Sequence, residues 1–139
     1  MLVLDLLSKY LAVARLKGSP VELIPGVLHL TYTTNTGGAF GMSGSTPWFF
    51  ASASVIVCGF ILFYMRRVTG VWRTIALGMV LGGALGNLIN RLAGGIDFSG
   101  EVVDFIDLRI WPVFNLADSA IVVGAVILAL SFARDRHED

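Results

Sequence analysis

Long apolar stretches alternate with short polar segments along the chain. The clearest stretch runs from Pro47 to Met65, and a second, Thr74 to Asn90, is also free of charged residues. A third runs from about Pro112 to Ala133 and carries a single charge, Asp118. Each is close to the roughly 20 residues that cross a bilayer as a helix. The pattern therefore predicts three membrane-spanning helices.

A further helix is expected at the N-terminus, over Met1 to about Ala14. It has no basic start and no small-residue cleavage site, so it does not match a cleavable signal peptide and is expected to be retained. Only four residues precede Asp5, which makes the segment too short to span alone. This indicates either a start further upstream or a shortened chain. With this helix, the expected fold is a mainly α membrane protein of four transmembrane helices.

The segment between the first two helices has a different pattern. Residues from Val21 to Thr34 alternate, are rich in β-branched side chains and contain a Pro25-Gly26 turn, which predicts short antiparallel strands. The fold therefore includes a small extracytoplasmic β-rich segment between helices one and two. We expect a single membrane-embedded domain over residues 1–139, because no internal repeat or low-complexity linker divides the chain.

The arginines predict the orientation in the membrane. They cluster between the second and third helices and after the last one: Arg66, Arg67, Arg73, Arg134 and Arg136. Because cytoplasmic loops carry the excess of Lys and Arg, both termini are expected in the cytoplasm. Asp104 and Asp118 would then lie at the outer face of the membrane.

Composition narrows the class of protein. Hydrophobic residues make up 55% of the chain and charged residues 14%, with a mean hydropathy of +0.78 and a net charge of zero. These values are typical of an integral membrane protein and give no basic field for nucleic acid. Cys58 is the only cysteine, and no Cys- or His-rich cluster suggests a metal site or another cofactor. We therefore expect no cofactor.

Two carboxylates at membrane depth are the candidate chemistry. Asp104 and Asp118 are fourteen residues apart, and the residues between them can fold back so that the two meet. Closely spaced carboxylates share a proton, so one can act as a base and the other as an acid in peptide hydrolysis. Spacing alone leaves an ion or proton path equally open. Asp107 is an alternative partner for Asp104.

Five ordered sequence blocks resemble those of the lipoprotein signal peptidase (signal peptidase II) family. They are DLLSK (5–9), NTGGAFG (35–41), GGALGNLINR (82–91), VVDFI (102–106) and FNLADSA (114–120). The resemblance covers essentially the whole chain. It implies a four-helix aspartic peptidase of the bacterial inner membrane, whose substrate is a prolipoprotein cut just before its lipid-modified cysteine. It also implies Asp104 and Asp118 as the catalytic pair, with membrane lipid as the surroundings.

The same resemblance indicates supporting residues near the pair. Asn35, Asn87, Arg91 and Asn115 are expected to bind substrate or orient a carboxylate. Asn87 and Arg91 share a helix face with Gly83, and Asn115 projects on the same side as Asp118. Without the resemblance, these asparagines could equally cap helices. Asp5 and Lys9 are four residues apart and are interpreted as a structural ion pair.

Two positions depart from the family pattern. Asn90 stands where the family carries Asp, so it offers Arg91 no charge, and Leu6 replaces a Gln. Asn90 is interpreted as structural, yet together with the short first helix it leaves a catalytically impaired homologue that still binds prolipoprotein as one alternative. A small membrane transporter is the other alternative, although the apolar stretches lack the polar path that it requires.

Overall fold

Four helices and a three-stranded sheet make up the computed structural model, which describes residues 1–36, 47–94 and 100–138. The helices are α1 (Leu2–Leu16), α2 (Pro47–Met65), α3 (Val71–Leu92) and α4 (Leu116–Glu138). The predicted bounds of α2 are confirmed, and α3 extends the predicted helix at both ends. Residues 37–41 of one family block lie outside the described residues.

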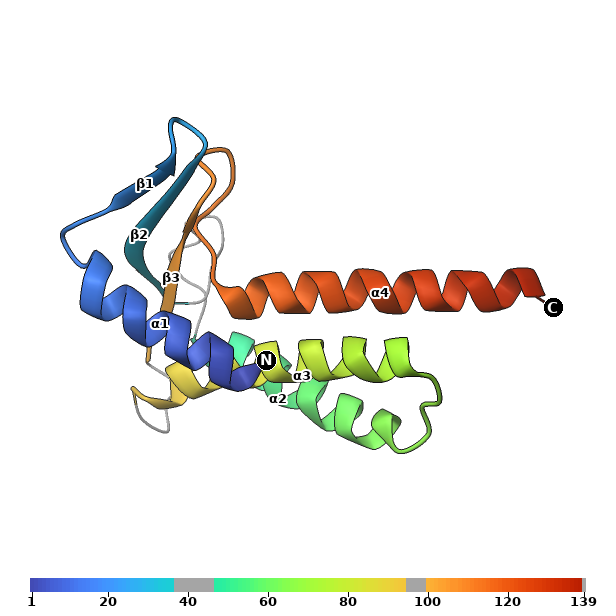
Figure 1. The fold of residues 1–139 in the computed structure, drawn as a ribbon. Helices are drawn as coiled ribbons and strands as arrows, with labels where there is room; N and C mark the ends of the chain where they lie inside the picture. The colour runs from blue at the N-terminus through green and yellow to red at the C-terminus, as the bar shows by residue number, and fades with distance from the viewer. Residues whose placement is uncertain (37–46, 95–99, 139) are drawn as a thin grey trace.

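The sheet stands at one end of the helices (Figure 1). Its strands are β1 (Val21–Ile24), β2 (Leu28–Asn35) and β3 (Val102–Asp107), in the order β1-β2-β3 with antiparallel neighbours. The β1–β2 hairpin confirms the predicted strands, and Gly26 adopts a φ of 69° in its turn. The expectation that the sheet lies wholly between helices one and two was incomplete, because β3 follows α3 and pairs with β2.

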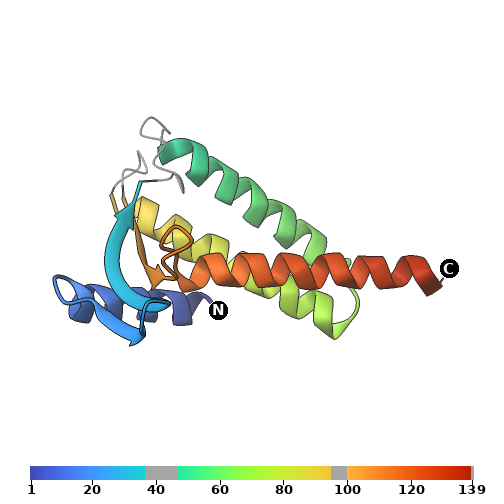
Figure 2. The same ribbon diagram turned by 90° about the horizontal axis from the view of Figure 1, so that it is seen from above.

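Three of the described helices are long and apolar enough to cross a membrane. These spans are Trp48–Met65, Val71–Leu92 and Leu116–Arg134. In the first and last of these spans only 17% of the residues are buried inside the protein, whereas in the middle span 50% of the residues are buried. The difference arises because α3 lies between α2 and α4 and also contacts α1 (Figure 2). Apolar side chains on α2 and α4 are left for lipid to cover.

Glycines allow the close approach of helices to α3. A Cβ on Gly83 would lie 2.6 Å from the backbone oxygen of Ala117 in α4, and a Cβ on Gly86 would collide with the carboxylate of Asp5 in α1. Gly78 has no atom within 4 Å of such a Cβ. Among these three glycines, close packing therefore requires Gly83 and Gly86, in the half of α3 nearer the sheet, and does not require Gly78.

The fourth helix begins later than the expected start at Pro112. Phe114 instead pairs with Ile106 as an isolated β-bridge, and the helix starts at Leu116. Pro112 lies in the connection between β3 and α4. Asn115, the residue before the helix, caps its first turn. This change moves Asp118 to the third residue of the helix.

Candidate active site

Asp104 reaches the site through the alternation of β3. Successive side chains of a strand point to opposite faces, so Asp104 and Phe105 lie on opposite sides of the sheet. Asp104 pairs with Thr33 in the register of β2 and β3, and Asn35 lies two residues further along β2 on the same face. The Asp104 side chain is only 2% exposed. The strand thus presents a buried carboxyl group to the start of α4.

Asp118 is held by the first turn of α4. The Asn115 side-chain oxygen accepts a hydrogen bond from the Asp118 backbone N–H at 2.9 Å. In return, Asp118 Oδ2 accepts one from the Asn115 backbone N–H at 3.2 Å. These reciprocal bonds form a capping box, with Asn115 before the helix and Asp118 at its third position. The cap therefore fixes where the carboxylate points.

The amide of Asn115 joins the two aspartates. Its Nδ2 donates to Asp104 Oδ1 at 2.7 Å, while its Oδ1 is occupied by Asp118. Asn115 is fully buried. One side chain therefore caps α4 through the Asp118 backbone and also donates to the Asp104 carboxyl group, so the capping interpretation and the site interpretation of Asn115 both hold.

Burial raises the pKa of Asp104 from its usual 3.8 to about 6, and the negative charge of Asp118 adds to this. Hydrogen bonds from Asn115 and Asn35, and the charge of Lys9, oppose the rise. Removing water disfavours the charged form of a carboxyl group, and a second carboxylate disfavours it further. Asp104 is therefore suited to carry a proton near neutral pH.

A cavity of about 280 Å³ opens onto both aspartates. It is lined by polar and aromatic side chains from the sheet, α2, α3 and the segment before α4: Asn35, Phe50, Arg91, Asp104, Trp111, Pro112, Val113, Phe114 and Asp118. Arg91 is 8% exposed, and its guanidinium lies 5.8 Å from the centre of the Phe50 ring. A cavity with two carboxyl groups and a cation can bind a polar chain and exchange protons with it.

Lys9 and Asp5 lie behind this cavity. Lys9 Nζ is 2.7 Å from Asp5 Oδ2 and donates to Asn87 Oδ1 at 2.8 Å. Asn87 Nδ2 in turn donates to Asp118 Oδ1 at 2.8 Å. Asp5 Oδ1 accepts the backbone N–H of Ala117 at 2.9 Å. The expected ion pair is present, and it also contacts the start of α4.

Two expected residues do not meet the aspartates. Asp107, the alternative carboxylate, accepts the backbone N–H of Arg109 at 2.8 Å and so stabilises the turn after β3. Asn90 does not line the cavity, and its buried Oδ1 has no hydrogen-bond partner among the described residues.

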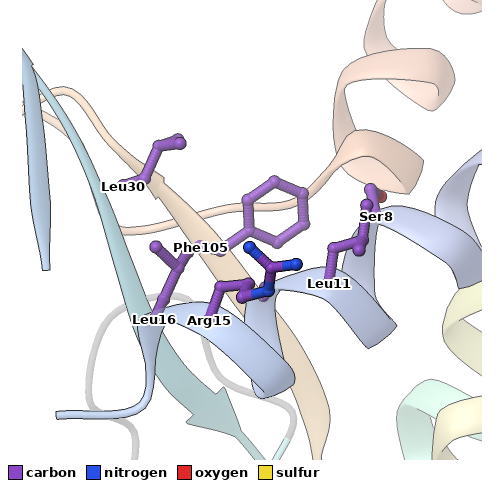
Figure 3. A pocket seen from close by; sticks show the side chains of 7 residues that line it. Ser8, Leu11, Arg15, Leu16, Leu30 and Phe105 are labelled. Carbon is purple, nitrogen blue, oxygen red and sulfur yellow. The ribbon is translucent and has the colours of Figure 1, made fainter. Parts of the chain in front are cut away.

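A second hollow lies on the opposite face of β3, between the sheet and α1. It has a volume of about 390 Å³. Figure 3 shows Phe105 and Leu30 of the sheet above Leu11, Arg15 and Leu16 of α1. Its lining is almost wholly apolar and contains no carboxyl group. It lacks the acid–base pair of the first cavity.

Some site residues were not identified from the sequence. Phe50 was not among the expected site residues. The available signal was its position, because it is an aromatic residue in the first turn of α2, which follows the β1–β2 segment. Trp111, just before α4, also lines the cavity. The contact of Lys9 with Asn87 spans 78 positions, and no local pattern encodes it.

Comparison with known proteins agrees with this arrangement. The sequence profile described as Signal peptidase (SPase) II matches residues 1–134. The lipoprotein signal peptidase of Halothermothrix orenii is 43% identical over 131 residues, covering 93% of this chain and 87% of the relative. That of Moorella thermoacetica is 46% identical over 132 residues, covering 91% and 83%.

Solved structures show the same fold. One is a bacterial membrane enzyme determined by the in meso method at 2.3 Å, with a TM-score of 0.85, 28% identity and coverage of 99% of this chain and 85% of that chain. A second, at 1.9 Å, has a TM-score of 0.82, 30% identity and coverage of 96% and 88%. The profile match and the relatives together show that this chain belongs to the signal peptidase II family.

Proposed function

We propose that this chain is a membrane aspartic endopeptidase that removes the signal peptide from diacylglyceryl-modified prolipoproteins. It cuts just before the lipid-modified cysteine, with Asp104 and Asp118 as the catalytic pair. The observation that carries the proposal is the Asn115 amide, which bonds to both aspartates at the mouth of one cavity. The names of the relatives supply the substrate class.

The pair can hydrolyse a peptide bond by acid–base catalysis. One carboxylate takes a proton from a water molecule while the protonated partner polarises the scissile carbonyl. The raised pKa of Asp104, about 6, supports a pair that holds one proton between its members at weakly acidic pH and in part at neutral pH. No covalent intermediate is needed.

The cavity lining suggests how the peptide is held. Arg91 Nε is buried and has no hydrogen-bond partner among the described residues, so it can donate to a peptide carbonyl. Asn35 lies at the opposite wall and can bond to the peptide backbone. An apolar groove of about 410 Å³, lined in part by Val122 and Val123, begins at Asp118 and suits the acyl chains of the substrate.

The proposed setting is the bacterial inner membrane, with four transmembrane helices. In this setting α1 is the fourth membrane helix, both termini are cytoplasmic and the active site lies at the outer face. The support is the placement of the arginines: Arg66 and Arg67 follow the end of α2 that lies away from the sheet (Figure 1).

The test is cleavage of a diacylglyceryl-modified prolipoprotein by the purified chain in detergent or bilayer, followed by mass spectrometry of the product. Asp104→Asn and Asp118→Asn should each lower kcat by at least about 10³-fold, within the range that general acid–base groups supply. Asp107→Asn is the matched control on the same strand and should cleave normally. Full activity in either of the first two variants would refute the catalytic pair.

Asn90 supports a second candidate, a homologue of reduced activity. Its buried Oδ1 lacks a partner among the residues that the structure describes. If the chain is impaired at this position, Asn90→Asp should raise the cleavage rate, because a carboxylate restores the family pattern beside Arg91. An unchanged or lower rate in the same assay would show that Asn90 does not limit activity.

A further inference from the structure

Lys9 and Asn115 together fix which way the amide of Asn87 points, because Asn115 Nδ2 donates at 3.2 Å to the same Asn87 oxygen that Lys9 contacts. The ammonium group is 3% exposed and lies between Asp5 Oδ2 and Asn87 Oδ1. An ammonium group can only donate hydrogen bonds, so it requires the amide oxygen of Asn87 on its side. The amide NH₂ must then face away from Lys9, toward Asp118, where its nitrogen lies 2.8 Å from Oδ1.

Both oxygens of Asp118 therefore meet groups that can only donate. Oδ1 receives the amide NH₂ of Asn87, whose orientation Lys9 and Asn115 fix, and Oδ2 receives the backbone N–H of Asn115. Protonation of either oxygen would weaken it as the acceptor of these hydrogen bonds. Hydrogen bonding to the charged form favours that form, so this arrangement selects a carboxylate at Asp118.

Asp104 has a different set of partners. Its Oδ1 accepts from Asn115 Nδ2 at 2.7 Å. Its other side-chain hydrogen bond comes from Asn35 and also favours the charged form, but burial and the charge of Asp118 outweigh both bonds and raise the pKa of Asp104. The surroundings of Asp104 thus favour its protonated form, whereas the two hydrogen bonds to Asp118 are stronger when Asp118 is ionised.

We propose that Lys9, acting through Asn87, keeps Asp118 ionised and thereby leaves the shared proton on Asp104. This inference rests on the proposed function and assigns the role of base to Asp118 and the role of acid to Asp104. Lys9 is a positioning residue, because it contacts Asn87 and Asp5 and does not line the cavity. Among the described residues, the other charged groups that act on the pair are Arg91, whose charge reaches both aspartates, and Asp5, which is paired with Lys9.

The assignment gives a balanced reaction. Asp118 removes a proton from water as the water oxygen bonds to the scissile carbon, and Asp104 gives its proton to the carbonyl oxygen, which produces a gem-diol. Asp118 then passes its proton to the leaving nitrogen as the C–N bond breaks. A gem-diol hydroxyl returns a proton to Asp104 as the new carboxylic acid forms. The pair ends in its starting state.

The test is the pH profile of kcat/KM for prolipoprotein cleavage, in the unchanged chain and in Lys9→Met. Removing the ammonium should move the acidic limb, where Asp118 takes up a proton, toward higher pH by about one unit. The alkaline limb should move less. Lys17→Met is the matched control, because Lys17 lies at the end of the same helix over the Tyr32 ring and should leave both limbs unchanged.

Asn87→Ala provides a second test if Lys9→Met does not fold. This variant keeps the Asp5–Lys9 ion pair but removes the donor to Asp118, so its acidic limb should also move to higher pH. Profiles that keep their shape and lose only amplitude, or a larger shift of the alkaline limb, would overturn the assignment. Loss of activity in both Asp104→Asn and Asp118→Asn tests the catalytic pair separately, so the two proposals can fail independently.

Discussion

Two adjacent residues of β3 face very different surroundings. Asp104 points into a cavity shared with Arg91 and Asp118, whereas Phe105 points into an apolar hollow against α1. The two hollows have comparable volumes, about 280 and 390 Å³. Only the first contains carboxyl groups and a network of amides.

This difference shows how the register of one strand separates proton chemistry from packing. A slip of one residue between β2 and β3 would exchange Asp104 and Phe105 between the two hollows. Thr33 pairs with Asp104 in the observed register, and an irregularity between Leu30 and Thr33 shifts the register by one residue before His29 pairs with Asp107. The following predictions test the polar side first and the apolar side last.

Outside the catalytic pair, the largest effect is expected at Asn115, on the polar side. Asn115→Ser keeps an oxygen that can cap α4 but loses the NH₂ group that donates to Asp104, whereas Asn115→Ala loses both. Both variants should lower kcat by at least about 100-fold, the effect of removing one positioned donor. Only Asn115→Ala should also lose the stability of the cap, about 1 kcal/mol. An active Asn115→Ser enzyme would show that capping is the sole role of Asn115.

A smaller effect is expected from the contact between α1 and α3. Gly86→Ala places a methyl group against the Asp5 carboxylate and must displace it from Ala117 and Lys9. We expect activity to fall by about 10-fold to 100-fold, because small displacements near reacting groups are costly. Gly78→Ala meets nothing within 4 Å and should cleave normally with an equal or higher Tm. Equal behaviour of the two variants would contradict this packing difference.

The pH dependence of stability should report on the Asp104 carboxyl. Its pKa is about 6 in the folded chain against a usual 3.8, so the folded chain binds more protons within this window and stability falls as pH rises through it. Asp104→Asn cannot ionise and should lose less Tm between these pH values, by a few degrees. Thermal unfolding in detergent at pH 4 and pH 7 measures this, with Asp107→Asn as control. An equal change in Tm between pH 4 and pH 7 in the unchanged chain, Asp104→Asn and Asp107→Asn would refute the raised pKa of Asp104.

The smallest effect on catalysis is expected on the apolar side. Phe105→Ala removes a half-buried ring from the hollow against α1 and should cost about 2 kcal/mol of stability, less than a fully buried Phe. Cleavage per folded molecule should be nearly unchanged, and the pH profile should keep its position. A displaced profile would show that the two faces of β3 are coupled.

Local patterns in the sequence predicted much of the fold. The uncharged run of α2 and the β-branched alternation around Pro25-Gly26 define their elements without help from distant residues. The start of α4 was wrong by several residues because Pro112 is a favourable first helical residue, while the structure uses Asn115 as the cap. The β-bridge between Phe114 and Ile106 keeps the residues before Asn115 out of the helix. This bridge forms only when the sheet is folded, so the sequence around Pro112 does not reveal it.

The candidate site was predictable as a set of residues but not as an arrangement. The family blocks indicated Asp104, Asp118 and their asparagines. The direction of each amide follows from groups far away in sequence, such as Lys9 for Asn87. Asp5 and Lys9 were interpreted as a local pair because their spacing fits one helix, and that spacing carries no information on what lies opposite.

The capping box of α4 has a consequence for how the enzyme matures in the membrane. The carboxylate proposed to activate water is also the third residue of the helix, and its oxygen closes the first turn. A copy whose helix has frayed, or whose α1 has not yet docked, lacks a correctly aimed Asp118. Proteolytic competence therefore depends on a closed first turn of α4 and on a docked α1.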